Sequence, residues 1–367
     1  MKKIAVVFGT RPEIIKLAEI IPLLKRKKNV QTLLVFTGQH YDYNLFGIFM
    51  KELGLPEPDI NLGIGSGTQA YQVGTILMKL EECFAKEKPG IVAGLGDTNS
   101  VFGAALAAEK MKIPFAHIEA GIRSFDRTMP EEVNRVLTDQ ISSYCFAPTK
   151  TAVKNLHKSE APGNRIFLTG NPIVEVVQKN LEKSRNSGIM EKLSLKKNEF
   201  VLLTMHRSEN VDSGEKLESI ANALSKIKWK IVFPMHPRAR AKIEESGLTE
   251  KFNAIKNIVI TEPLGYFDFL QLCANSRYLL SDSGGVQEEA AVYKKFVIIL
   301  RENTERPEIL GKFGVLAGFN EKKIISSAGK IEKGFAELEK KLQKIACPFG
   351  DGKASRRIVE KLLEAVK

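Results

Sequence analysis

Three carboxylates at the ends of predicted strands are the residues of this chain whose placement most suggests catalysis. Asp97 follows an apolar run at 91–95, Glu119 follows a second run at 115–118, and Glu131 begins the next predicted helix. The carboxyl ends of parallel strands share one edge of a sheet, so we expect the three side chains to lie near one another. Carboxylates that are close together or partly desolvated acquire separated pKa values. The group therefore suits a reaction in which one acid gives a proton and another takes it.

Two of these acids also have a structural interpretation. Asp97 is suited to capping the helix that follows it, and Glu131 forms a capping-box pattern with Thr128. Glu119 has no such alternative, because no helix is predicted to start for about ten residues after it. Four of the five histidines, His40, His117, His206 and His236, also fall at or beside strand ends. Their spacing is not that of a metal site and no cysteine accompanies them, so we expect no bound metal.

A glycine turn at 281–285 predicts an anion site in the second half of the chain. An apolar run leads into Ser283-Gly284-Gly285, and a helical pattern follows. Such a turn directs free backbone N–H groups and the positive end of a helix at a phosphate, with Asp282 or Ser283 as the expected helix cap. Glu289 falls at the edge of the helix's apolar stripe, while Glu288 is predicted to point away from it. An acid beside an anion site suits sugar hydroxyls, although an ordinary capped helix explains the same pattern.

Cationic and donor side chains accompany these turns. Arg11 and Lys16 bracket the start of the first predicted helix, Arg207 and His236 follow strands of the second half, and Arg306 follows the strand after the glycine turn. Arg11 and Lys16 suit a phosphate or carboxylate ligand, with the alternative of being ordinary surface cations, and Arg306 is a second candidate phosphate clamp. The residues by themselves thus predict a site for a phosphorylated, hydroxyl-bearing ligand, lined by carboxylates and a histidine.

Composition and motifs also bear on which partners, which cellular location and which cofactors the chain is expected to have. The 367 residues carry a net charge of +12, but the lysines are spread over helices and are not interleaved with aromatic residues, so we expect no nucleic-acid partner. No stretch is long and apolar enough to span a membrane, and Arg11 and Glu13 interrupt the apolar start too early for a signal peptide. Four scattered cysteines show no disulfide or metal pattern, which predicts a cytoplasmic location. Dinucleotide and Walker motifs are missing, so we expect no cofactor.

Strands and helices alternate along the chain, and the alternation restarts after about 198. This predicts an α/β fold of two doubly wound, Rossmann-like domains facing a cleft. We place an N-terminal domain at 1–170 and a C-terminal domain at 171–353, with the hinge between 170 and 198. Among the individual elements we expect one long helix at 12–28, an irregular stretch at 56–68, and a final helix at 354–366 that could pack on either domain.

Several motifs in one order extend the argument over the whole chain. They are Gly9-Thr10-Arg11-Pro12-Glu13, Gly96-Asp97-Thr98-Asn99, Glu119-Ala120-Gly121, Pro130-Glu131-Glu132, Ser283-Gly284-Gly285-x-Gln287-Glu288-Glu289-Ala290 and Thr304-Glu305-Arg306-Pro307. With them the chain resembles the non-hydrolysing UDP-N-acetylglucosamine 2-epimerases from end to end. The resemblance implies the glycosyltransferase-B architecture, with the helix at 354–366 returning to the N-terminal domain.

The resemblance also implies roles for individual residues. The positions that match catalytic residues of the family are Asp97, Glu119, Glu131 and His206. Those expected to bind UDP-sugar are Arg11, Lys16, Arg207, His236, Leu264, Phe269, Ser283, Gly284, Gly285, Glu289 and Arg306. Within this set the C-terminal domain would hold UDP, with Ser283 to Gly285 at the diphosphate and Glu289 at the ribose. A homodimer and cofactor-free elimination and re-addition of UDP are implied as well.

The chain departs from the bacterial pattern in two places. His206-Arg207-Ser208-Glu209 stands where His-Arg-Arg-Glu is expected, and Gln39-His40 resembles part of an allosteric substrate site whose arginine is missing at 66–68. Three alternatives remain open from the sequence. They are epimerisation of UDP-2,3-diacetamido-2,3-dideoxy-glucuronic acid, glycosyl transfer on the same architecture, and nucleic-acid binding, against which the acids at the strand ends argue.

Overall fold

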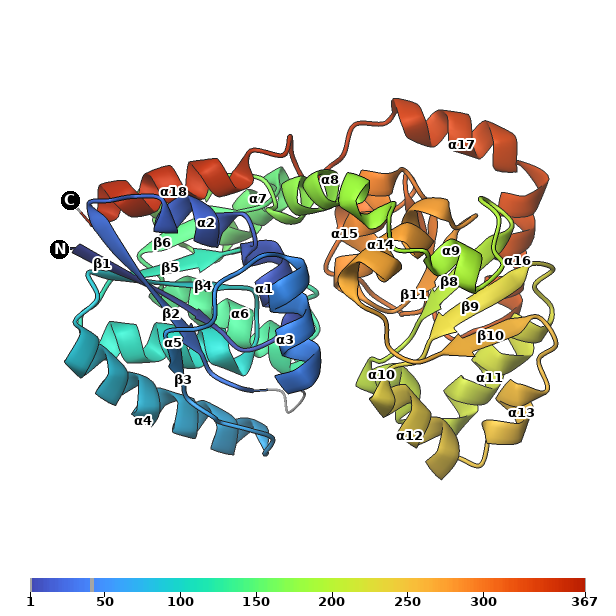
Figure 1. Cartoon of the computed structure of the whole chain (residues 1–367), viewed down its shortest axis with the longest axis horizontal. Coiled ribbons are helices and arrows are strands. Elements are labelled where there is room, and N and C mark those ends of the chain that lie inside the picture. Colours follow the sequence, from blue (N-terminus) through green and yellow to red (C-terminus); the bar gives the residue numbers. More distant parts are fainter. Residues whose placement is uncertain (1, 40–42, 367) are drawn as a thin grey trace. The chain divides into compact units, whose positions relative to one another are not determined.

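The computed structural model describes residues 2–39 and 43–366, and the chain divides into two compact units. One unit contains the residues up to Val176 together with those from Phe349 on, and the other runs from Val177 to Pro348. The helix α8 (Ile173–Ser184) contains the first of these boundaries. The C-terminal helix α18 (Ala354–Ala365) belongs to the first unit, where it packs against α2 (Figure 1).

The first unit is built on a parallel sheet, in which seven strands of the described residues are ordered β3-β2-β1-β4-β5-β6-β7. The strands are β1 (Lys2–Phe8), β2 (Val30–Phe36), β3 (Ile60–Asn61), β4 (Ile91–Leu95), β5 (Phe115–Ile118), β6 (Tyr144–Ala147) and β7 (Ile166–Leu168). Residues 4–8 and 91–95 are buried without interruption. Such continuous apolar runs are expected of parallel strands that are covered by helices on both faces.

Helices cover both faces of this sheet. They are α1 (Arg11–Leu17), α2 (Ile20–Lys25), α3 (Tyr43–Glu52), α4 (Gln69–Glu87), α5 (Asn99–Lys110), α6 (Pro130–Ile141), α7 (Lys150–Lys158) and α18. Neighbours α4, α5 and α6 lie side by side on one face, where α7 also packs on Cys145 and Ala147 of β6, and α2 and α18 lie on the other face (Figure 1). A core cluster joins the apolar sides of α4 and α5 to alternate residues of β1, β2 and β4.

The single long helix expected at 12–28 is wrong, because the chain forms α1 and α2 with a break at Ala18 and Glu19. Pro22 explains the break. It has no N–H to bond to the carbonyl of Ala18, and its ring occupies the space that this carbonyl takes in a continuous helix. The irregular stretch expected at 56–68 contains the short strand β3, which pairs with β2 at the edge of the sheet.

The second unit repeats the architecture with six described strands in the order β10-β9-β8-β11-β12-β13. They are β8 (Phe200–Thr204), β9 (Lys230–Pro234), β10 (Ile258–Thr261), β11 (Leu279–Ser281), β12 (Val297–Ile299) and β13 (Gly314–Leu316). Its helices are α9 (Ile189–Lys192), α10 (Ser208–Val211), α11 (Gly214–Ser225), α12 (Pro237–Glu245), α13 (Thr249–Asn253), α14 (Tyr266–Asn275), α15 (Gly284–Tyr293), α16 (Glu321–Lys333) and α17 (Phe335–Lys344). The predicted fold class, α/β with two parallel sheets, is confirmed.

Strand order identifies where each unit should bind a ligand. In the first sheet the order reverses between β1 and β4, and in the second it reverses between β8 and β11. The loops that leave neighbouring strands at such a point diverge to opposite faces and open a crevice at the carboxyl ends. The Arg11 and Asp97 turns follow β1 and β4, and the His206 and Ser283 turns follow β8 and β11. None of the helices within the described ranges is long and apolar enough to cross a bilayer.

Candidate active site

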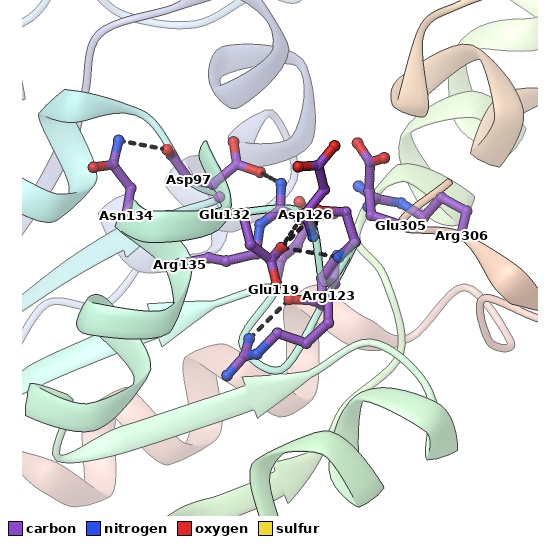
Figure 2. A network of polar contacts seen from close by, with 12 residues as sticks. Asp97, Glu119, Arg123, Asp126, Glu132, Asn134, Arg135, Glu305 and Arg306 are labelled. Carbon is purple, nitrogen blue, oxygen red and sulfur yellow. Dashed lines mark hydrogen bonds and ion pairs between the residues drawn. The ribbon is translucent and has the colours of Figure 1, made fainter. Parts of the chain in front are cut away.

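Asp97 leaves β4 and is held by the buried Arg135 of α6 (Figure 2). The guanidinium donates to Asp97 Oδ2 over 2.5 Å and to Glu132 Oε2 over 2.9 Å. Asn134 of the same helix donates to the Asp97 carbonyl over 3.0 Å. Asp97 does not cap α5, because Thr98 occupies that position and accepts from the Val101 N–H. The interpretation of Asp97 as a helix cap is therefore wrong. Its carboxylate lies at the carboxyl edge of the sheet and is not used to cap α5.

Glu132 shapes the loop that follows Glu119. Its carboxylate accepts from the Ser124 N–H over 2.9 Å, from the Ser124 hydroxyl over 3.0 Å and from the Phe125 N–H over 3.1 Å. The predicted Thr128–Glu131 capping box is not formed, since Met129 precedes the helix and the Thr128 hydroxyl donates to Asp126. Glu131 lies in the first turn of α6 and is half-buried. Its neighbour Glu132 thus takes the structural role that the sequence pattern assigned to Glu131.

Glu119 lies directly after β5 in a strained backbone conformation. Its φ is +70°, a region that few residues other than glycine adopt, and such strain concentrates at functional sites. The side chain is only 6% exposed. Its Oε1 accepts from Lys16 Nζ over 2.5 Å and from Asn171 Nδ2 over 2.6 Å. Lys16, expected to bind a phosphate or a carboxylate of the ligand, lies against a candidate catalytic acid of its own unit.

His117 belongs to a buried network beneath this turn and is not a solvent-facing site histidine. Its Nδ1 lies 2.6 Å from Asp139 Oδ1, and its Nε2 lies 2.8 Å from the Gly96 carbonyl. Asp139 also contacts Arg123 over 2.6 Å and accepts from the Gly121 N–H over 3.0 Å. Burial raises the pKa of Asp139, but the charges and hydrogen bonds of His117 and Arg123 outweigh it, so the pKa is lowered overall. The network thereby joins the Asp97 turn to the Glu119 turn.

Glu13 connects the first helix to the Asp97 turn. Its carboxylate accepts from the N–H groups of Gly9 and Thr10 over 2.6 Å each and from the Thr98 hydroxyl over 2.5 Å. Burial is the largest influence on this group and raises the pKa of Glu13 to about 7, although the hydrogen bonds oppose it. Gly9 leaves no room for a side chain, because a Cβ there would collide with Ser100 and Thr37.

The raised pKa of Glu13 predicts a pH dependence of stability. The folded chain binds this proton more tightly than the unfolded chain, so the contribution of Glu13 is greatest below about pH 4.5 and declines as the pH rises to about 7. Relative to Glu13→Gln, which keeps an acceptor oxygen and does not ionise, the free energy of unfolding should fall by about 3 kcal/mol between pH 4.5 and 8. Denaturation of both proteins over that range measures the difference. A difference that is flat or rises with pH would contradict the expectation.

The glycine turn of the second unit is organised differently from the prediction. Ser283 precedes α15, but its side chain makes no capping hydrogen bond. Asp282 turns the other way and accepts at Oδ2 from the N–H groups of His206 and Arg207 over 2.9 Å each. Its Oδ1 lies 3.5 Å from His206 Nδ1. The expected helix cap is therefore wrong, and Asp282 fixes the histidine turn against the glycine turn.

Helix α15 is buried on nearly all sides, and this changes the environment of its two glutamates. Glu288, predicted to point away from the apolar stripe of the helix, is fully buried and pairs with Arg306 Nε. Glu289 is 6% exposed. Burial, followed by the negative charge of Glu289, raises the pKa of the Tyr266 phenol well above its usual range. Helix α15 packs against α14, the helix that also carries Phe269.

The other candidates occupy a range of positions. His206 and His236 are neighbours, with ring centroids 5.5 Å apart. The guanidinium of Arg207 lies 3.5 Å from the Glu305 carboxylate. Arg11 lies over the Phe49 ring. Gln39 Oε1 accepts from the N–H and hydroxyl of Ser100. Half-buried positions are those of Leu264, Phe269, Ser283 and Gly285, while Gly284 is buried. His40 lies outside the described residues. Within the described ranges no three His, Cys, Asp or Glu side chains gather as a metal site would require.

Four residues that position this site were missed from the sequence: Glu132, Asn134, Arg135 and Asp139. A signal was present, because Glu132, Arg135 and Asp139 recur at intervals of three and four, the spacing that places side chains on one face of a helix. All three are buried. A charged stripe at core spacing on a helix indicates a buried polar network.

Comparison with known proteins identifies the family of the chain. A family model described as UDP-N-acetylglucosamine 2-epimerase matches residues 23–363. A UDP-N-acetylglucosamine 2-epimerase of Methanocaldococcus jannaschii is 45% identical over 97% of this chain and 98% of that protein. A UDP-2,3-diacetamido-2,3-dideoxy-D-glucuronate 2-epimerase of Pseudomonas aeruginosa is 37% identical over 98% of this chain and 99% of that protein.

A crystal structure of the M. jannaschii UDP-GlcNAc 2-epimerase in complex with UDP-GlcNAc and UDP superposes with a TM-score of 0.90 at 44% identity, covering 99% of each chain. The agreement extends over both sheets and confirms the glycosyltransferase-B type of fold that the motifs implied. Sequence and structure lead to one conclusion: the chain belongs to the UDP-N-acetylglucosamine 2-epimerase family.

Proposed function

We propose that this chain, a nucleotide-sugar isomerase by its family, interconverts UDP-N-acetylglucosamine and UDP-N-acetylmannosamine through elimination and re-addition of UDP. The observation that carries the proposal is the pair of acids at the β1/β4 switch point and its neighbour β5. Asp97 is held by Arg135, and the strained Glu119 is held by Lys16. Two carboxylates held by cationic partners, Asp97 half-buried and Glu119 buried, meet the need for one proton donor and one proton acceptor.

The chemistry explains why such a pair is needed. The hydrogen on C2 of the sugar is not next to a carbonyl, so its removal alone has no acceptor for the electron pair. Departure of UDP from C1 supplies one, because the C2–H electrons form a C1=C2 double bond as the C1–O bond breaks. UDP then adds back at C1 while C2 receives a proton on its opposite face. The site must therefore hold the departing diphosphate with donors throughout the reaction.

We assign the roles within the two units as follows. The catalytic set is Asp97, Glu119, Glu131 and His206. The UDP-sugar ligands are Arg11, Lys16, Arg207, His236, Leu264, Phe269, Ser283, Gly284, Gly285, Glu289 and Arg306. The backbone around Gly285 supports the diphosphate position, because a Cβ there would meet only Ser283 Oγ at 3.9 Å and leaves the turn open to a ligand. The burial of Glu289 at the edge of α15 supports its pairing with ribose hydroxyls.

A second substrate is favoured by one observation. The Pseudomonas relative acts on UDP-2,3-diacetamido-2,3-dideoxy-D-glucuronate, and it matches this chain over nearly its full length. The greater identity to the M. jannaschii UDP-N-acetylglucosamine enzyme supports the simpler sugar. Turnover of the purified protein on each sugar distinguishes the two.

The decisive experiment follows hydrogen at C2. We expect incubation with UDP-N-acetylglucosamine in deuterated water to place solvent deuterium at C2 of both sugars without added NAD. Nuclear magnetic resonance of the C1 and C2 positions measures it. Epimerisation that retains the original hydrogen at C2 would overturn the elimination mechanism, and the absence of any epimer would overturn the function.

Two further proposals concern the assembly and location of the chain. A homodimer is supported by Tyr71 and Met78, large side chains of α4 that are 61% and 59% exposed. Cytoplasmic location is supported by the free thiols of the four cysteines. Sedimentation equilibrium and cell fractionation test the two proposals.

A further inference from the structure

Asn171, a residue without an assigned role, contacts Glu119 from the segment that precedes α8. It is 1% exposed, and its Nδ2 donates to Glu119 Oε1 over 2.6 Å. It also lies where two distant segments of the first unit meet, because its backbone N–H donates to the Phe349 carbonyl over 2.8 Å. A Cβ on Gly350 would lie 3.1 Å from the Cα of Gly170, so the two segments leave Asn171 little freedom.

The orientation of the Asn171 amide is determined by its second contact. Its Oδ1 accepts from the Ile173 N–H over 3.0 Å, and an N–H can only donate. The carbonyl oxygen of the amide must therefore face Ile173, which leaves the NH₂ group to face Glu119. The contact to Glu119 is thus a donated hydrogen bond whose direction the network fixes.

Two donors consequently converge on one oxygen of Glu119. Lys16 Nζ contributes the other, over 2.5 Å, and neither an ammonium nor an amide NH₂ accepts a proton from a carboxyl group. Oε1 therefore cannot carry the acidic proton while both contacts are made. Oε2 accepts no hydrogen bond from the described part of the chain, so it is the oxygen of this carboxylate that is left for a ligand.

We propose that Asn171 is a positioning residue that, together with Lys16, saturates Oε1 of Glu119 and so makes Oε2 the atom that takes the proton from C2. This rests on the proposed function. In the elimination step the C2–H bond breaks, the proton joins Oε2, and the C–H electron pair becomes the C1=C2 bond as UDP leaves with the C1–O pair. In the reverse step the proton returns from Oε2 to C2. A separate acid serves the other face of the ring.

The charged groups around Glu119 bear on any pH measurement. Lys16 approaches from α1, and the Asp139–His117–Arg123 network lies beneath the turn against α6. Arg357 of α18 donates to the Thr169 carbonyl, two residues before Asn171, and pairs with Asp351. A change confined to Asn171 leaves all of these groups in place.

Asn171→Asp is the sharpest variant. It keeps an acceptor for the Ile173 N–H but replaces the donor to Glu119 with a second carboxylate, and two adjoining carboxyl groups share a proton. We expect the acidic limb of the kcat profile to move to higher pH by at least one unit. At pH 7 kcat should be at least tenfold lower, with KM within about threefold of the wild type. Asn155→Asp is the matched control, because Asn155 is also buried and donates to the Gly121 carbonyl of the same loop without touching a carboxylate.

A second variant covers the case in which Asn171→Asp does not fold. Asn171→Ser removes the donor to Glu119 without adding charge, and its hydroxyl retains an acceptor for a nearby N–H. Its kcat should fall at least tenfold. A kcat profile of Asn171→Asp that superimposes on that of the wild type, or an unchanged kcat in Asn171→Ser, would overturn the role of Asn171. Wild-type protein that introduces no deuterium at C2 would instead overturn the proposed function itself.

Discussion

Replacing Glu119 with glutamine is expected to lower epimerisation and the exchange of C2 hydrogen with solvent by at least about a thousandfold, while UDP still binds. The amide cannot take a proton, yet it retains an oxygen that can accept from Lys16 and Asn171, so the turn should keep its shape. Single-turnover kinetics in deuterated water measures the chemical step, and calorimetry measures the affinity for UDP. Wild-type rates of exchange in Glu119→Gln would remove Glu119 from the mechanism.

Glu289→Ala is expected to have the opposite effect, a loss of UDP affinity with the chemical step retained. Glu289 belongs to the second unit and is proposed to bind the ribose, so its loss should weaken UDP binding about tenfold or more and leave C2 exchange measurable at saturating substrate. A variant pair in which Glu119→Gln loses chemistry and Glu289→Ala loses affinity separates the two proposed functions. If Glu289→Ala bound UDP as tightly as the wild type, the assignment of the ribose site would be wrong.

Replacing Asp139 with alanine is expected to destabilise the first unit by about 3–5 kcal/mol, the usual result of removing one partner from a buried ion pair. Asp139 is 2% exposed and contacts His117, Arg123 and the Gly121 N–H. Its removal leaves a buried guanidinium without its carboxylate. Gly121 has no tolerance for movement toward α7, since a Cβ there would overlap the Ala152 carbonyl. Activity should fall with stability, because the same network holds both acidic turns.

The measurement must distinguish the units. The single tryptophan, Trp229, lies in the second unit, so its fluorescence does not report on the first. Hydrogen exchange of the amides in β5 and α6 does, and these amides should lose protection in Asp139→Ala. Asp351→Ala is the control in the same unit. Its pairing with Arg357 is half exposed, and surface pairs are worth about 1 kcal/mol or less. Equal losses in both variants would contradict the buried-network interpretation.

The sequence predicted best the strands and helices that can be recognised from the residue pattern of their own segment, without contacts to distant residues. Runs dominated by apolar residues, such as 91–95 and 115–118, gave strands with the observed bounds, and α6 was predicted to its observed limits. The break between α1 and α2 lay within reach of the sequence, because Pro22 carries its own steric reason. The short strands β3 and β13 did not, because two or three residues become a strand only by pairing with a neighbour distant in sequence.

For the site, the sequence by itself determined which candidate residues follow strands. A turn that follows a parallel strand must lie at the carboxyl edge of the sheet, whatever its partners. Only the tertiary structure decided what each residue contacts. It assigned Asp97 to Arg135, Lys16 and Asn171 to Glu119, Asp282 to the His206 turn and Glu288 to Arg306. These partners are separated by up to 103 positions in the sequence. The physical reason is that a hydrogen bond depends on distance and direction in space, and neither is encoded in the spacing of residues along one chain.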